Sequence, residues 1–187
     1  MVTQESSVIQ SDMNKKIEKR PLIMGVDPGY TGAITVFDAH LKKIIDIIDI
    51  PTTKYPKPSS KRGYGLKIDA PTLAIALDTY ATKTALAVLE EPGAMPKQGL
   101  SSTFNFGHTC GLLHGILSGL YIPVMPVKPA IWKAKIGVSY EKKTAISLAN
   151  KIFPTSESMW TLKKHHDRAE SALLVYYGLN MLGIPYK

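Results

Sequence analysis

Short apolar runs separated by turn residues dominate the first quarter of the chain. Residues 21–27 and 33–38 are almost entirely apolar, and 44–50 alternates apolar residues with Asp46 and Asp49. Proline, glycine and other turn-forming residues fill the short connections between these runs. Three strands joined by such tight connections predict an antiparallel meander.

After residue 68 the pattern changes to helices that alternate with single strands. Asp69 before Ala70-Pro71 is a good N-cap for a helix, and Ser101 or Ser102 is a candidate N-cap for a longer one. The predicted helices cover 69–82, 101–120, a short stretch from 128, 141–152 and 165–182, and the predicted strands cover 85–90 and 121–127. The order predicts an α/β fold with a five-stranded mixed sheet, in which a three-strand antiparallel meander is joined by two parallel strands and helices cover both faces.

One segment shows neither the period of a strand nor that of a helix. Residues 51–65 are rich in proline, lysine and serine and predict a mobile loop. Residues 54–67 contain five basic residues and no acid, namely Lys54, Lys57, Lys61, Arg62 and Lys67. This clustering favours contact with a polyanion such as DNA, and a solvated basic face is the alternative.

Composition sets limits on the class of protein. With 187 residues and 44% hydrophobic content, the chain is expected to form one domain over 21–187, preceded by a flexible basic arm over 1–20. The net charge of +8 favours acidic partners. A lone Cys110 fits a reducing interior, and no apolar run is long enough to span a membrane. We therefore expect a cytoplasmic protein, with an organellar presequence left open.

The predicted long helix carries a glycine every fourth residue, at Gly107, Gly111, Gly115 and Gly119. Each glycine costs a helix interior about 1 kcal/mol relative to alanine, so the four cost about 4 kcal/mol together. Close packing must offset this cost. Two interpretations remain: packing against the protein's own sheet, or contact with a second copy across a two-fold axis.

Four acidic residues suggest the chemistry. Asp27 and Glu90 each end an apolar, strand-like run, while Asp167 and Glu170 are three apart in a helical pattern and share one helix face. Carboxylates that converge repel one another unless a cation holds them. Oxygen-rich clusters suit Mg²⁺ or Mn²⁺, and paired ions clamp the attacking and leaving oxygens in phosphodiester hydrolysis. The pattern predicts a metal-dependent nuclease.

The same residues resemble the RuvC family of Holliday-junction resolvases, particularly the phage and prophage type. The resemblance runs from Ile23 to about Leu179. Its motifs, in order, are Gly25-Val26-Asp27-Pro28-Gly29 with Gly32-Ala33, the segment from Glu90 to Gly99 followed by Ser101 to Gly107, Trp132-Lys133, and Asp167-Arg168-Ala169-Glu170-Ser171-Ala172. The resemblance implies an RNase H-like fold, a homodimer, and paired cleavage of four-way junction DNA in recombination, repair or phage DNA processing.

Carried over by motif, Asp27, Glu90, Asp167 and Glu170 correspond to the catalytic ligands of two Mg²⁺ or Mn²⁺ ions. The family places phosphate-contacting lysines at Lys133, Lys142 and Lys143, and we add Lys61 and Arg62 of the basic segment as candidate DNA contacts. His166 is a candidate auxiliary group because an imidazole titrates near working pH. With the homodimer that the resemblance implies, we expect the second interpretation of the glycine-bearing helix, contact with a second copy through Gly107, Gly111, Gly115 and Gly119.

Two positions depart from the family pattern. Bacterial relatives carry an aromatic residue where this chain has Gly93, so base stacking must come from elsewhere, with Phe104, Phe106 and Tyr30 as candidates. Glu170 stands where relatives often have Asp. Three rivals stay open: a related nuclease acting on RNA–DNA hybrid or structured RNA, a non-catalytic junction-binding protein, and an actin-like or sugar-kinase ATPase, for which the chain is short.

Overall fold

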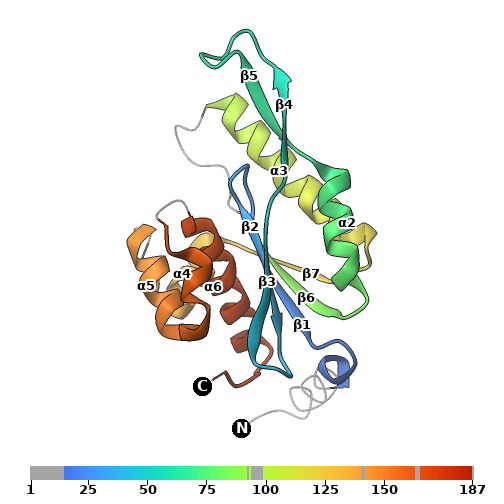
Figure 1. The fold of residues 1–187 in the computed structure, drawn as a ribbon, viewed down its shortest axis with the longest axis vertical. Helices are drawn as coiled ribbons and strands as arrows, with labels where there is room; N and C mark the ends of the chain where they lie inside the picture. Colours follow the sequence, from blue (N-terminus) through green and yellow to red (C-terminus); the bar gives the residue numbers. More distant parts are fainter. Residues whose placement is uncertain (1–14, 92, 94–98, 140–141, 163–164, 187) are drawn as a thin grey trace.

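A five-stranded mixed sheet forms the centre of the molecule in the computed structural model, which describes residues 15–91, 93, 99–139, 142–162 and 165–186. The strands lie in the order β3-β2-β1-β6-β7 (Figure 1). β1 pairs antiparallel with β2 and parallel with β6, which completes the predicted meander-plus-parallel arrangement. The strands are β1 (Leu22–Asp27), β2 (Ala33–Asp38), β3 (Lys43–Asp49), β6 (Thr84–Glu90) and β7 (Val124–Val127). The predicted fold class is therefore confirmed.

Helices cover both faces of this sheet, as predicted. One face packs against α2 (Ala70–Ala81) and α3 (Leu100–Gly119) through a core that includes Leu73, Leu77, Leu113 and Leu117. The other face carries α4 (Pro129–Ile136), α5 (Lys142–Ile152), the 3-10 helix η1 (Pro154–Trp160) and α6 (His166–Met181). Because alternate residues of a strand point to opposite faces, the apolar strands β1 and β6 contribute to both cores.

The predicted mobile loop over 51–65 is wrong. Residues Thr52–Pro56 and Tyr64–Ile68 form an antiparallel two-stranded ribbon, β4–β5, that projects beyond the sheet (Figure 1). The ring of Tyr55 lies over Gly65, its cross-strand neighbour, and the Lys54 ammonium lies 4.6 Å from the centre of the Tyr64 ring. These cross-strand contacts order a segment whose composition resembles that of a loop.

Smaller predictions also need correction. The flexible arm predicted over 1–20 extends too far, because residues 15–19 are helical and Ile17 packs against the core that contains α6. The N-cap of α3 is Gly99 and not a serine, whereas Asp69 caps α2 as expected by accepting from the Thr72 amide (3.3 Å). The 3-10 helix η1 was not predicted. In the described part of the chain, no helix is both long and apolar enough to cross a membrane.

The glycines of α3 do not pack against the protein's own sheet. A Cβ added at any of the four positions meets nothing within 4 Å among the described atoms, and all four residues are exposed. The first of the two interpretations is therefore wrong. The cost of the four glycines is not recovered within one copy of the chain.

Gly25 of β1, in contrast, is required by packing. A Cβ at this position would overlap the carbonyl oxygen of Ser171 and lie 2.7 Å from the amide nitrogen of Val175, both in α6. The backbones of β1 and α6 therefore approach more closely than any side chain allows. This approach brings the first turns of α6 to the end of β1.

We expect Gly25→Ala to destabilise the protein by at least about 1–3 kcal/mol, the cost of overpacking a close contact. Urea unfolding followed by circular dichroism measures the change. Gly93→Ala is the matched control: its new methyl group meets nothing within 4 Å among the described atoms, so stability should change little. Equal stability of the two variants would show that β1 and α6 are not in close contact.

Candidate active site

Two acidic residues end the two central parallel strands. Asp27 is the last residue of β1 and Glu90 the last of β6, and the register pairs the residues just before them, Val26 with Leu89. Both carboxylates therefore lie next to each other at the end of the sheet where β1 and β6 finish. Both residues are buried.

The other two acids come from the first two turns of α6. Asp167 lies in its first turn and Glu170 three residues later, so both face the same way. Close packing at Gly25 brings this part of α6 against β1. The structure thus places all four predicted acids around one point, drawn from β1, β6 and α6.

Electrostatics confirm that the four acids interact. Burial raises the pKa of Asp27 well above its usual range, and the charges of Glu170, Glu90 and Asp167 raise it further. The Lys133 ammonium acts in the opposite direction. Since each effect but the last opposes ionisation, Asp27 is the group that most needs a positive neighbour.

Glu90 is held by a tryptophan. The indole Nε1 of Trp132, a fully buried residue of α4, donates to Glu90 Oε2 at 2.6 Å. This hydrogen bond lowers the pKa of Glu90, but burial and the nearby Glu170 raise it by more. Trp132 is therefore both a core residue and an orienting donor for a carboxylate of the site.

Lys133 lies inside the cluster and not on the protein surface. Its Nζ is 2.8 Å from Glu170 Oε1, and the side chain is buried. The prediction of a phosphate-contacting lysine placed it near DNA; the structure instead pairs it with an acid of the site. The burial of Lys133 excludes a solvated surface lysine at this position.

His166 also contacts the cluster. Its Nε2 is 2.7 Å from Asp167 Oδ1, whereas the second oxygen, Oδ2, is buried and has no hydrogen-bond partner among the described residues. A buried carboxylate oxygen without a partner is costly and normally requires explanation. A cation bound by Asp167 would provide the missing partner.

The donor set fits a hard divalent cation, because it consists of carboxylate oxygens. Within the described residues, no three acidic, histidine or cysteine side chains already stand in the geometry of a metal cage. Trp132 and Lys133 hold Glu90 and Glu170, respectively. A metal ion held by these acids would need both side chains to shift, with the Lys133 ammonium moving away from Glu170.

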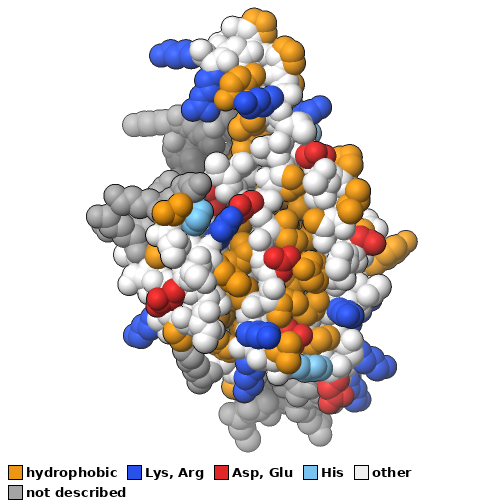
Figure 2. Space-filling model, viewed as in Figure 1, with side chains coloured by type: hydrophobic (Ala, Val, Ile, Leu, Met, Phe, Trp, Pro, Cys, Tyr) orange, Lys and Arg blue, Asp and Glu red, His pale blue; other side chains and the backbone are white. Residues whose placement is uncertain are grey.

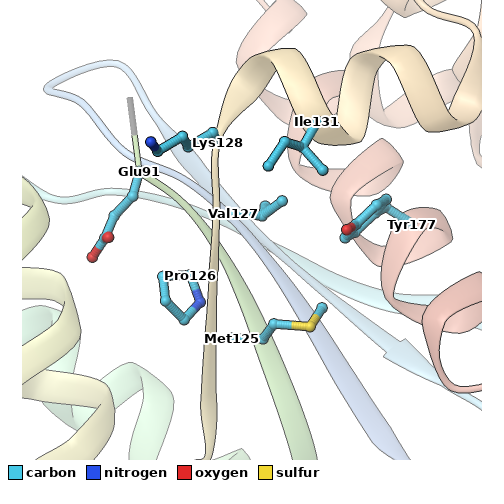
Figure 3. Close-up of a pocket in the computed structure, with 7 residues that line it drawn as sticks. All are labelled: Glu91, Met125, Pro126, Val127, Lys128, Ile131 and Tyr177. Atoms are coloured by element: carbon cyan, nitrogen blue, oxygen red, sulfur yellow. The ribbon is translucent and has the colours of Figure 1, made fainter. Parts of the chain in front are cut away.

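The neighbouring acid Glu91 lies outside the cluster. It is half-exposed, and its Oε1 is 3.7 Å from His114 Nδ1 on α3. Figure 3 shows its side chain on the opposite side of β7 from Tyr177. Glu90, the residue chosen from the sequence, is the one that faces Asp27.

The remaining candidate DNA contacts lie elsewhere. Lys61 and Arg62 are exposed in the turn of the β4–β5 ribbon, at the end of the molecule where Lys and Arg side chains gather in Figure 2. Lys142 and Lys143 open α5, and their side chains lie outside the described residues. Among the described residues, neither Lys61 nor Arg62 contacts the acidic cluster.

Sequence reasoning missed one more residue near the site. Arg168, between the two acids of α6, forms a two-pronged ion pair with Asp49 at the end of β3. An arginine next to Asp167 was visible in the sequence. Its partner was not, because 119 residues separate the two.

No family model and no curated protein match this sequence. Among solved structures, Thermus thermophilus RuvC in complex with a Holliday-junction substrate superposes with a TM-score of 0.57 at 16% identity, covering 86% of this chain and 95% of that one. The fowlpox virus Holliday-junction resolvase gives a TM-score of 0.48 at 17% identity, over 86% and 99%. The first comparison shows that this chain has the RNase H-like fold of RuvC.

We expect Asp27→Asn to stabilise the metal-free protein. Because the pKa of Asp27 is raised by folding, wild-type stability falls as the pH rises above the ordinary carboxyl value of 3.8. The neutral amide removes that loss, so the gain should grow towards pH 8 in chelator. A gain of about 1 kcal/mol raises Tm by about 2–4 °C in a domain of this size.

Differential scanning calorimetry between pH 5 and 8 measures the effect. Asp78→Asn, which changes an exposed acid on α2, is the control and should leave Tm and its pH dependence unaltered. A lower Tm for Asp27→Asn than for wild type in chelator would contradict the account of the cluster.

Proposed function

We propose that the protein is a divalent-metal-dependent endonuclease that resolves four-way DNA junctions by paired phosphodiester hydrolysis. The observation that carries the proposal is the convergence of Glu90, Asp167 and Glu170 on Asp27 at the end of an RNase H-like sheet. A purely structural, junction-binding protein gains nothing from a buried cluster that opposes its own folding. The similarity of fold to RuvC bound to a junction adds support.

Asp27, Glu90, Asp167 and Glu170 are the residues that would hold two Mg²⁺ or Mn²⁺ ions. Such ions lower the pKa of a bound water and stabilise the charge that develops on the phosphate oxygens. Trp132 orients Glu90 through Nε1, and His166 orients Asp167 through Nε2. If an ion took the place of the Lys133 ammonium beside Glu170, that ammonium would be available to the phosphate backbone, so the burial of Lys133 is compatible with a role in DNA binding.

The wider surface suits a polyanion. The protein carries a net charge of +8, and the β4–β5 ribbon holds Lys57, Lys61 and Arg62 in a turn ordered by backbone hydrogen bonds, including those from Lys57 N to Gly63 O (3.0 Å) and from Gly63 N to Ser60 O (2.8 Å). The ribbon follows β3, whose last residue lies at the same sheet edge as Asp27. DNA held by the ribbon therefore passes near the acids. Lysine and arginine contacts of this kind position DNA without reading its sequence.

The exposed face of α3 is the proposed dimer contact. Its four glycines are exposed, and Leu100 and Phe104, which are 91% and 74% exposed, continue the same helix face at spacings of three and four residues. Two chains that meet along this face gain close backbone contact and bury both apolar side chains. A two-fold dimer presents two equivalent active sites, as the paired cleavage of a four-way junction requires.

Cleavage of a synthetic four-way junction tests the proposed activity. We expect symmetric paired nicks with Mg²⁺ or Mn²⁺ and none with chelator. Asp27→Asn should cut at least ~10³-fold more slowly, since it loses several kcal/mol of transition-state stabilisation, while it binds the junction with nearly wild-type affinity. Gel assays with end-labelled strands measure both quantities.

An RNA–DNA hybrid duplex and a plain DNA duplex serve as substrate controls. Preferred cutting of the hybrid would favour the alternative nuclease activity. Junction binding without any cutting in either metal would favour a structural role. Because Asp27→Asn is expected to be more stable than wild type, its loss of activity cannot be attributed to unfolding.

We expect Gly111→Leu to convert a dimer into a monomer, because the new side chain separates the two helices. Analytical ultracentrifugation gives the oligomeric state, and the junction assay should show loss of paired cuts. Ser102→Leu is the control: Ser102 is exposed on the same helix about two and a half turns away, on the opposite side. A variant that remains dimeric would place the dimer contact on another surface.

A further inference from the structure

Arg168 lies between the two acids of α6, but its side chain points to the end of β3. Arg168 Nε donates to Asp49 Oδ1 at 2.6 Å, and its Nη2 donates to Asp49 Oδ2. Its Nη1 donates to the carbonyl oxygen of Met159 at 3.0 Å. One side chain thus joins the first turn of α6 to the end of β3 and to η1.

The geometry of this pair restricts orientation as well as distance. Two parallel N–H···O bonds between a planar guanidinium and a carboxylate allow little rotation, unlike a single lysine contact. The pairing also raises the pKa of Arg168, because the hydrogen bonds to Asp49 favour the charged form. The third bond, to Met159, fixes the guanidinium from a second side.

Asp49 lies in the same row of the sheet as Asp27. The register pairs Asp27 of β1 with Ala33 of β2, and Ala33 with Asp49 of β3. Two strand spacings separate the two acids, or about 10 Å between their backbones. The pair therefore attaches the first turn of α6 to a fixed point on the edge from which Asp27 projects.

A cavity of about 260 Å³ lies between the pair and the acidic cluster, and its lining includes Tyr30, Gly32, Asp49, His165, Asp167 and Arg168. Asp167 contributes a buried oxygen that has no hydrogen-bond partner in the part of the chain that the structure describes. Arg168, the residue next to Asp167, is thus anchored by three hydrogen bonds. Asp167 itself keeps a carboxylate oxygen that could bind a cation. An anchored backbone with an unpartnered carboxylate oxygen is the arrangement expected of a prepared metal ligand.

We propose that Arg168 and Asp49 are a positioning pair that fixes the orientation of Asp167 and Glu170 for cation binding. The inference rests on the proposed function only in taking these acids as ligands of the ion. Arg168 does not touch the ion or the DNA. Loss of either partner leaves the start of α6 free to rotate, and the acids then bind the cation more weakly.

The test measures Mn²⁺ affinity without DNA, by titration calorimetry on the full chain. Arg168→Gln and Asp49→Asn should each weaken binding by ~10–100-fold, as is typical when a group that orients a metal ligand is lost. The double variant should be no weaker than the weaker single variant, because both changes remove one interaction. Junction affinity in chelator should stay within about twofold of wild type in all three.

Asp46→Asn is the matched control. Asp46 is on the same strand and accepts from the Tyr80 hydroxyl at 2.7 Å, away from α6. This variant should lose stability but keep its Mn²⁺ affinity. It shows what a purely structural hydrogen bond of β3 does in the same assay.

Three results would overturn the proposal. The first is that the wild-type protein fails to bind Mn²⁺. The second is that the two single variants lower Tm but keep wild-type Mn²⁺ affinity. The third is that Arg168→Gln alone weakens junction binding in chelator, which would make Arg168 a phosphate contact. If the variants behave as predicted but the wild-type protein cuts no DNA, the positioning pair stands and the proposed activity fails.

Discussion

The burial of Asp27 beside three other acids is the constraint on which the functional part of this structure depends. Asp27 is buried at the end of a central strand, and three further acids face it from β6 and α6. Such a cluster opposes folding unless positive charge is supplied. Without metal, the Lys133 ammonium supplies part of it through Glu170. The protein is therefore less stable because of the acids that its proposed chemistry requires, as is common at active sites.

The surrounding residues hold each acid in place. A close backbone contact at Gly25 brings α6 to β1, Trp132 holds Glu90, and the Asp49–Arg168 pair anchors the start of α6. These contacts come from four different elements around one edge of the sheet. The β4–β5 ribbon begins at the same end of the sheet, because β4 follows Asp49 after two residues. The ribbon therefore joins the exposed basic side chains to the end of the sheet where the acids lie.

The sequence predicts the sheet well because strand and helix periods are local. Asp27 and Glu90 were placed correctly, since each ends an apolar run and the ends of parallel strands meet. The ribbon was missed because proline and lysine suggest a loop, whereas the contact of Tyr55 with Gly65 depends on pairing across the turn. The contact of Lys133 with Glu170 was not predicted, because it depends on how α4 packs on α6, and 37 residues separate the two. The partner of Arg168 was invisible for the same reason.

The most direct measurement of the central claim is the anomalous scattering of manganese in crystals of the protein soaked in Mn²⁺. The account predicts one or two peaks between Asp27, Glu90 and the first two turns of α6, with the Lys133 ammonium moved away from Glu170. Crystals with no manganese between these residues, and with Lys133 still paired to Glu170, would contradict it.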